Sequence, residues 1–245
     1  MLRITFAVLL LFAASCSCEE CNYPPSLWCS DPGISRACQV EQQCQDWKTR
    51  SHDPAPPVNV TVYIESLCPD CRNFIKKMLY PTWKTLENTG IMNLQLVPYG
   101  NAEETAVGDK WNFTCQHGAM ECWGNLLETC TLHFEKFPTA FDIIHCAEVA
   151  TFPIDAYSKC VTKFGADFDQ INECAKGDLG NQLEHEMALQ TAALVPPHKY
   201  VPWVTVNGDH TEDMEKKAEA DLLSLVCSTY QGTQPKECQP TKIFL

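Results

Sequence analysis

Two cysteines separated by two residues form the most reactive pattern in the chain. Cys68-Pro69-Asp70-Cys71 is a CxxC dithiol, which can attack, form and resolve disulfide bonds. It follows the alternating apolar run from Val58 to Ile64 and precedes a helix-like apolar segment that includes Phe74. A strand that leads into a CxxC at a helix start is a typical arrangement for a redox-active dithiol.

This position predicts different roles for the two cysteines. Free backbone N–H groups and the partial positive charge of a helix N-terminus stabilise the Cys68 thiolate, so Cys68 is the predicted nucleophile. Cys71 follows one helical turn later and is predicted to resolve a mixed disulfide formed on Cys68. Asp70 opposes the thiolate when it is ionised, so the Pro69-Asp70 pair should influence the redox potential and the pH optimum.

The elements that must position the dithiol follow the order strand, helix, strand. The first predicted strand covers Val58–Ile64, and the second lies around Leu94–Val97 and ends at Pro98. Pro81 should end or kink the helix that carries Cys71, because proline lacks a backbone N–H.

Residues far downstream supply the second half of the fold. Trp203–Val206 has the composition of a third strand, and Asn207-Gly208 is a turn signal before a helix with one apolar face. In thioredoxin-like folds a proline with a cis peptide bond packs against the dithiol. We expect Pro202, which follows Val201, to be that proline.

The segment between these halves, residues 101 to about 198, predicts an inserted, mostly helical subdomain that borders the CxxC. Its cysteines suit internal disulfide pairing: Cys115, Cys122, Cys130, Cys146, Cys160 and Cys174. The sequence does not choose among the possible pairings. The one pair we predict is Cys227 with Cys238, because both flank the end of the C-terminal helix.

The N-terminus and the cysteine content predict an oxidising compartment. Arg3, a short apolar run and small residues indicate a cleaved secretory signal over residues 1–17, with lipidation at Cys16 as a disfavoured alternative. Most of the 16 cysteines should be paired in such a compartment. The sequons at Asn59 and Asn112 are candidate glycosylation sites. No later apolar run is long enough for a membrane anchor.

The charge disfavours two classes of partner. With 18 basic and 31 acidic residues, the chain carries a formal net charge of −13, which repels nucleic acid and anionic lipid at neutral pH. Protonation of carboxylates and histidines reduces this charge in acid, which is compatible with work in an acidic organelle, although simple solubility explains the acidity equally well.

A cysteine-rich block precedes the main domain. Residues 18–50 carry Cys21, Cys29, Cys38 and Cys44 with a Trp-Cys pair, and this spacing resembles the saposin A-type module. The resemblance implies a propeptide or sorting element, and a generic disulfide knot is the alternative. Residues 51–57 read as a Pro-rich linker, the main domain spans 58–238, and 239–245 form a tail.

A second motif resembles the signature of the gamma-interferon-inducible lysosomal thiol reductase family. Its defining positions are all present: Cys115, Gln116, His117, Gly118, Glu121, Cys122, Asn125 and Cys130. A histidine between cysteines also suggests zinc, but a second close ligand pair is missing and a lumen favours disulfides. We therefore expect no metal, and we expect His117 to be a hydrogen-bonded scaffold residue.

The resemblance implies an α/β, thioredoxin-like thiol reductase in the lumen of lysosomes and late endosomes, with some secreted form. It would reduce disulfides of unfolded or partly unfolded endocytosed proteins at acidic pH, as in antigen processing, without a resident cofactor and with a small thiol as reductant. A lysosomal sorting receptor could bind its glycans, and Cys16 or Cys18 could link two otherwise monomeric chains. The alternatives are a secretory-pathway oxidase or isomerase and a non-catalytic secreted binding module.

Overall fold

The computed structural model describes residues 21, 23, 25, 28–29, 31–50 and 55–239. The chain divides into two compact units, Met1–Pro54 and Ala55–Leu245. The predicted signal peptide, Cys16, Cys18 and the C-terminal residues 240–245 lie outside the described residues.

Two disulfides hold the first unit together. Helix α1 (Pro32–Ala37) begins after Asp31, whose side chain accepts a hydrogen bond from the Gly33 N–H, and α2 (Glu41–Arg50) follows. The disulfides join Cys21 to Cys38 and Cys29 to Cys44. A unit this small has little core, so these covalent links supply most of its constraint.

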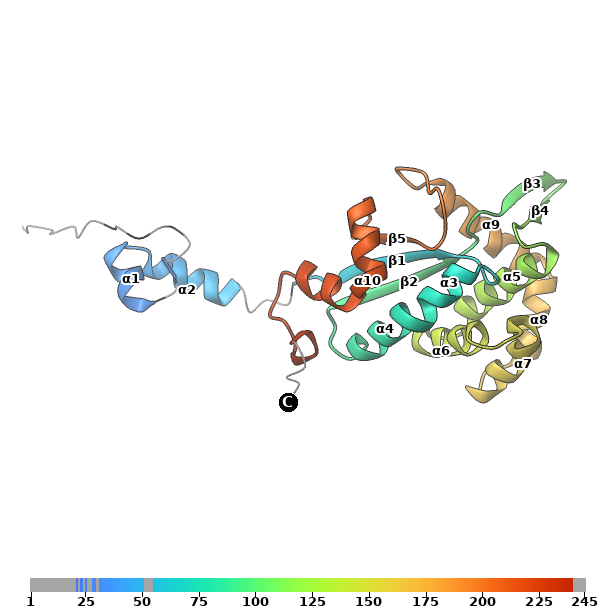
Figure 1. Ribbon diagram of the computed structural model, residues 1–245, viewed down its shortest axis with the longest axis horizontal. Coiled ribbons are helices and arrows are strands. Elements are labelled where there is room, and N and C mark those ends of the chain that lie inside the picture. The colour runs from blue at the N-terminus through green and yellow to red at the C-terminus, as the bar shows by residue number, and fades with distance from the viewer. Residues whose placement is uncertain are drawn as a thin grey trace, which may run out of the picture. The chain divides into compact units, whose positions relative to one another are not determined.

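A three-stranded sheet forms the centre of the second unit (Figure 1). Its order is β2 (Met92–Pro98), β1 (Val58–Ile64) and β5 (Trp203–Val206). Strand β1 runs parallel to β2 and antiparallel to β5. The first strand has the bounds that its alternating apolar residues predict.

One face of the sheet is covered by the helix that carries the dithiol and by α10 (Glu212–Thr229). Val60 and Val62 of β1 share one apolar core with Ile75 and Leu222 from these helices. The packing of these apolar side chains therefore holds the dithiol helix against the sheet.

The helix that carries Cys71 does not end at Pro81, so this part of the prediction is wrong. The chain runs from α3 (Pro69–Phe74) through a π-helical turn, η2 (Ile75–Leu79), into α4 (Tyr80–Leu86). The wider π-helical turn lies just before Pro81, where a regular helix would need the N–H that proline lacks and would clash with its ring.

The opposite face of the sheet is covered by α9 (Asp178–Ala192). Tyr63, Val97 and Trp203 point to this side and pack with Met187 of α9 and with Leu194 just beyond it. Strand residues that alternate in sequence thus separate into two cores.

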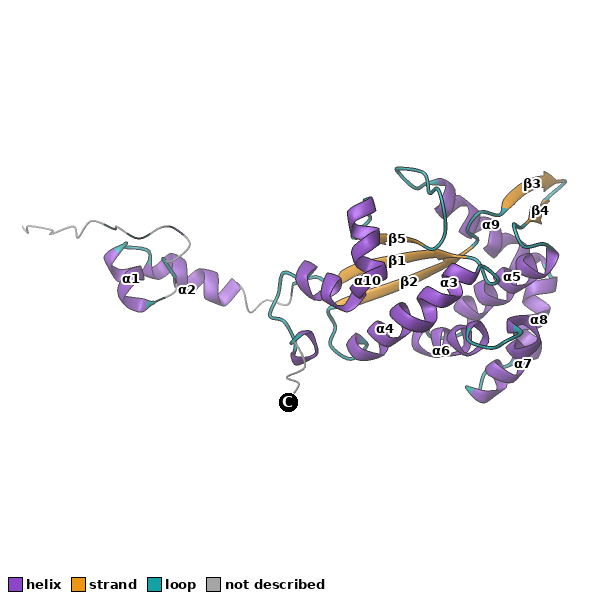
Figure 2. Ribbon diagram, viewed as in Figure 1, coloured by secondary structure: helices purple, strands orange, loops and turns teal. Residues whose placement is uncertain are grey.

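The insertion is mostly helical, as predicted, but it begins with a β-hairpin (Figure 2). Strands β3 (Glu103–Val107) and β4 (Lys110–Thr114) pair with each other and not with the main sheet. The helices before α9 are α5 (Ala119–Phe134), α6 (Phe137–Glu148), α7 (Pro153–Lys163) and α8 (Phe168–Lys176).

Disulfides tie this insertion together and close the C-terminus. Cys130 joins Cys174 between α5 and α8, and Cys146 joins Cys160 between α6 and α7. Cys115 joins Cys122 at the start of α5. The structure also contains the expected Cys227–Cys238 pair, which links α10 to the short helix η3 (Lys236–Cys238).

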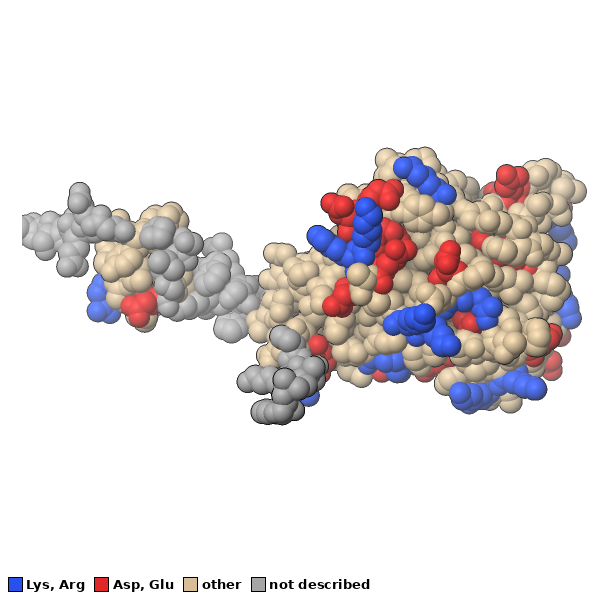
Figure 3. Space-filling view, viewed as in Figure 1, with Lys and Arg blue, Asp and Glu red and all other residues tan. Residues whose placement is uncertain are grey.

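The surface carries both signs of charge. On the face shown in Figure 3, acidic and basic side chains are interspersed instead of forming one continuous basic surface. Within the described part of the chain, the helices are too short or too polar to cross a membrane.

Candidate active site

The dithiol lies where strand β1 has ended and helix α3 begins. Cys68 is the N-cap of α3 and has extended backbone angles, with Pro69 in the first turn of the helix. The Cys71 backbone N–H donates to Cys68 Sγ at 3.5 Å. The first N–H groups of a helix have no partner within the helix, so Pro69, which lacks an N–H, loses no hydrogen bond there. The Cys68 side chain accepts a hydrogen bond from one of the other free N–H groups, that of Cys71.

These donors favour the Cys68 thiolate. The hydrogen bond from the Cys71 side chain, followed by the backbone N–H groups of Cys71 and Asp70, lowers the pKa of Cys68 to about 6 against the opposing effect of burial. The Asp70 charge raises that pKa, in the direction that the sequence predicts. Cys68 thus combines a helix-start position with a stabilised anion.

Cys71 has the opposite environment. It is fully buried, and burial raises its thiol pKa far above the ordinary value, with its neighbour Cys68 adding to the effect. Among the described cysteines, Cys68 and Cys71 alone are outside a disulfide. One sulfur is therefore prepared for attack and the other is held as a thiol.

The tertiary fold brings the predicted proline to the dithiol. The Val201–Pro202 peptide bond is cis, and the Cys68 thiol donates to the Val201 carbonyl oxygen at 3.8 Å. The sequence did not predict a second cis bond, Val195–Pro196.

Two pockets lie beside the dithiol motif, and Asp70, Tyr200 and Val201 line both of them. A pocket of about 430 Å³ is lined by Asp70, Phe74, Met78 and Pro202 among others. A smaller pocket of about 280 Å³ is lined by the following residues: Cys68, Pro69, Asp70, Asn101, Gln116, His117, Lys199, Tyr200 and Val201. Both could admit part of an extended peptide near the sulfur.

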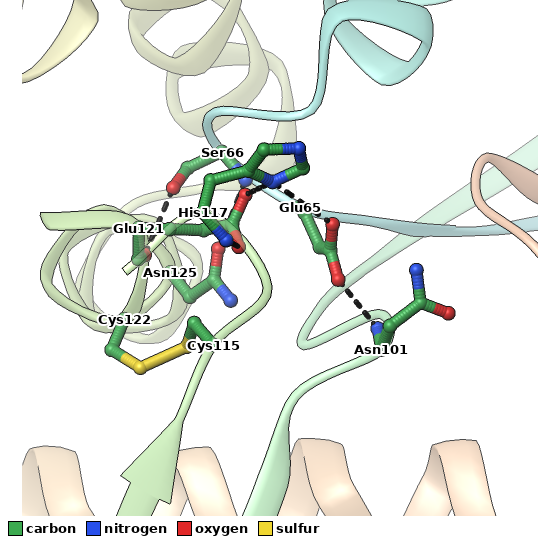
Figure 4. The surroundings of a disulfide bond; sticks show 8 residues. All are labelled: Glu65, Ser66, Asn101, Cys115, His117, Glu121, Cys122 and Asn125. Atoms are coloured by element: carbon green, nitrogen blue, oxygen red, sulfur yellow. Dashed lines mark hydrogen bonds and ion pairs between the residues drawn. A yellow bond between two sulfur atoms is a disulfide. The ribbon is translucent and has the colours of Figure 1, made fainter. Parts of the chain in front are cut away.

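The family-signature motif packs against the loop that leads to Cys68 (Figure 4). Asn125 Oδ1 accepts the Ser66 N–H at 2.9 Å, and Ser66 Oγ donates to the Glu121 carbonyl at 3.0 Å. A Cβ at Gly124 would lie 2.3 Å from Ser66 Oγ, so the close approach requires glycine there. The motif therefore holds the loop before the nucleophile.

The remaining signature residues build the turn before α5. The Cys115–Cys122 disulfide closes this turn, and Gly118 has φ of 89°, which glycine adopts easily. Gln116 Oε1 accepts a hydrogen bond from Asn101 Nδ2 at 2.8 Å. The third signature cysteine, Cys130, anchors α5 through its disulfide bond to Cys174.

His117 joins two buried carboxylates. Its Nδ1 lies 2.5 Å from Glu121 Oε2 and 3.6 Å from Glu65 Oε2. One ligand-type atom from each of Glu65, His117 and Glu121 lies within 4.8 Å of the others. Burial raises the pKa of Glu65 to about 7. His117 is thus hydrogen-bonded as expected, but it also lines the pocket that contains Cys68.

Sequence reasoning missed Glu65 and Arg72. Glu65 follows the last buried residue of β1, and a charged residue at the end of an apolar strand next to a CxxC was the available signal. Arg72 Nε donates to the Glu148 carbonyl at 3.0 Å, and Nη2 donates to the Ala150 carbonyl at 2.5 Å. Arg72 thereby ties the dithiol helix to the insertion.

The two candidate glycosylation sites lie on the surface, outside the dithiol motif. Asn59 is an exposed residue of β1, and Asn112 is an exposed residue of β4. Both side chains can be reached from solvent.

Comparison with known proteins identifies the family. A family model described as gamma interferon inducible lysosomal thiol reductase (GILT) matches residues 59–164. The gamma-interferon-inducible lysosomal thiol reductase of Carassius auratus is 44% identical over 238 residues, which cover 96% of this chain and 91% of that relative. The chain belongs to the gamma-interferon-inducible lysosomal thiol reductase family. The mouse (Mus musculus) protein of the same name is 45% identical over 183 residues, covering 74% of this chain and 71% of its own length.

Family membership makes the chain a thiol reductase, which is a thiol-disulfide oxidoreductase, and the CxxC at the start of α3 provides the dithiol that such chemistry requires. Among solved structures, DsbA from Chlamydia trachomatis aligns with a TM-score of 0.48 and 15% identity, covering 69% of this chain and 88% of that one. The thioredoxin-like arrangement is visible in the chain itself, in the order of β1, α3 and β2 and in the cis-proline before β5.

Proposed function

We propose that this protein reduces disulfide bonds of partly unfolded proteins in the acidic lumen of lysosomes and late endosomes, with Cys68 as nucleophile and Cys71 as resolving thiol. The observation that carries the proposal is the lowered pKa of Cys68, about 6, at a helix start beside the cis-proline. A thiol of ordinary pKa is almost wholly protonated at pH 5, whereas one with a pKa near 6 is roughly 9% thiolate.

The first step forms a mixed disulfide. The Cys68 thiolate attacks one sulfur of the substrate disulfide, a bond forms between them, and the other substrate sulfur leaves as a thiolate that takes up a proton. The Val201 carbonyl, 3.8 Å from Cys68 Sγ, marks the backbone beside which the substrate strand would lie.

The second step releases the product. Cys71 loses its proton and attacks Cys68 Sγ, so that the second substrate sulfur leaves and a Cys68–Cys71 disulfide remains. The substrate gains two electrons and the enzyme loses them. Two molecules of a small thiol then reduce the Cys68–Cys71 disulfide to the dithiol and are themselves oxidised to a disulfide.

Location and partners follow from the same proposal. The relatives carry lysosomal names, and the exposed asparagines Asn59 and Asn112 could carry glycans that a sorting receptor recognises. We propose antigens and other endocytosed proteins as substrates.

The test is reduction of insulin disulfides near pH 5 by the wild type, Cys68→Ser and Cys71→Ser. The wild type should be active and both variants should be inactive, and Cys71→Ser should accumulate a mixed disulfide through Cys68. Equal rates for all three proteins would overturn the enzymatic proposal. Trapping by Cys68→Ser, and not by Cys71→Ser, would reverse the two roles.

A further inference from the structure

Two buried carboxylates converge on one histidine next to the dithiol. We propose that Glu65, His117 and Glu121 form a binding site for a divalent metal ion of the zinc class. The proposal concerns binding and is independent of the reductase activity. It departs from the expectation of no metal, which considered His117 and the neighbouring cysteines as the ligands.

The orientation of both carboxylates supports a metal site (Figure 4). Glu65 Oε1 accepts the Asn101 N–H at 2.6 Å, and Glu121 Oε1 accepts the His117 N–H at 2.8 Å. In each case a backbone donor fixes one oxygen, while the other oxygen, Oε2, faces the His117 ring. Outer hydrogen bonds of this kind orient the ligands of metal sites.

One of the ligand oxygens is buried without a hydrogen bond. Glu65 is fully buried, and its Oε2 atom has no hydrogen-bond partner in the structure. A buried carboxylate oxygen without a partner is costly unless a cation or a donor reaches it. Its nearest ionic partner is His117 Nδ1, at 3.6 Å.

The charges of the cluster also fit a divalent ion. Glu65 and Glu121 can supply two negative charges, and among the described residues their ion pairs involve His117 alone. Histidine supplies at most one positive charge, whereas a divalent ion with a neutral histidine balances both carboxylates.

The three ligand atoms lie within 4.8 Å of one another, which is close enough for one ion to contact all of them after the side chains adjust. In a tetrahedral zinc site with bonds of about 2.0 Å, ligand atoms lie roughly 3.3 Å apart, so the 3.6 Å separation of Glu65 Oε2 from His117 Nδ1 is already suitable. The 2.5 Å contact of His117 with Glu121 must lengthen. A third of the His117 side chain, 34%, is exposed, so the ring can move and an ion can enter from solvent.

The ligands come from rigid parts of the fold. Glu65 follows β1, Glu121 lies in the first turn of α5, and the Cys115–Cys122 disulfide closes the turn that holds His117. These two cysteines are bonded to each other and are excluded as ligands. The open coordination position would be filled by water or by a solute, as at three-ligand zinc sites.

The test is a titration with Co²⁺, followed by displacement with Zn²⁺, near pH 7. The protein is used with Cys68 and Cys71 oxidised to a disulfide, because a free dithiol binds these metals itself. We expect the visible absorption of low-symmetry Co²⁺ with one ion per chain. Glu65→Gln and His117→Gln should each weaken binding by about tenfold or more.

Exposed residues of the same types provide matched controls. Glu173→Gln and His133→Gln should bind as the wild type does, and circular dichroism should show that every variant is folded. His117→Gln decides the result if Glu65→Gln does not fold, because His117 is partly exposed. Equal affinity in the wild type and in His117→Gln, or no binding by the wild type, would overturn the proposal.

Discussion

The hydrogen bond from Cys71 to Cys68 should set the pH at which the nucleophile reacts. The pKa of Cys68 is lowered from an ordinary value of 9.0 to about 6, and the hydrogen bond from the Cys71 side chain is the largest of the causes. Cys71→Ala removes this donor but keeps the backbone N–H groups of α3, so the Cys68 pKa should rise by at least about one unit without reaching its ordinary value. Cys71→Ser is the matched control, because its hydroxyl can still donate.

The magnitude follows from the thiolate population. At pH 5 a Cys68 pKa of about 6 leaves roughly 9% of the thiol ionised, and a rise of one unit reduces this to about 1%. The assay is the pH dependence of alkylation by iodoacetamide, with the modified residue identified by mass spectrometry. The midpoint should lie near pH 6 in the wild type, higher in Cys71→Ala, and between them in Cys71→Ser.

Two results would refute this reasoning. A wild-type midpoint near the ordinary thiol pKa would show that the helix start does not stabilise the Cys68 thiolate. An unchanged midpoint in Cys71→Ala would assign the stabilisation to the backbone N–H groups and not to the neighbouring thiol.

Further predictions concern stability. Burial raises the pKa of Glu215 to about 7. The contribution of its protonated form to folding stability is therefore fully present below the unfolded pKa near 4.5 and is lost as pH rises through 7. In urea unfolding, the free energy of unfolding of Glu215→Gln should therefore rise relative to that of the wild type by about 2 kcal/mol between pH 5 and pH 7.5, allowing for partial screening. The exposed control Glu219→Gln should show no such rise. An equal pH dependence in wild type and Glu215→Gln would indicate that Glu215 stays ionised beside His210, whose Nδ1 is 3.4 Å away. Arg72→Met should lower the free energy of unfolding by about 2 kcal/mol, because two partly buried carbonyls lose their charged donor. Lys76→Met, an exposed change in the next turn, should cost much less, and similar losses for both variants would contradict the role given to Arg72.

Much of the fold could be predicted because its signals are local. Alternating apolar residues define β1 over Val58–Ile64, and the CxxC marks the helix that follows. The hairpin Glu103–Thr114 was missed because its residues are mostly exposed and show no clear apolar alternation. The π-helical turn at Ile75–Leu79 was missed because Pro81 was expected only to end or kink the helix.

The disulfide pairs show where sequence reasoning stops. Cys227 and Cys238 are only 11 residues apart around a helix end, so their pairing could be predicted. Cys130 and Cys174 are 44 residues apart, and they meet only because α5 packs against α8. Such pairings depend on how whole helices dock, which no short pattern specifies.

The sequence by itself determined the chemistry of this protein: a dithiol at a helix start, a proline for the facing loop, and the signature of a reductase family. The tertiary structure alone decided what surrounds that dithiol. It gathered Glu65, His117 and Glu121 beside it. The physical reason is that capping and periodicity act between neighbours in the chain, whereas contacts between distant side chains arise only when the packed core fixes the positions of entire strands and helices.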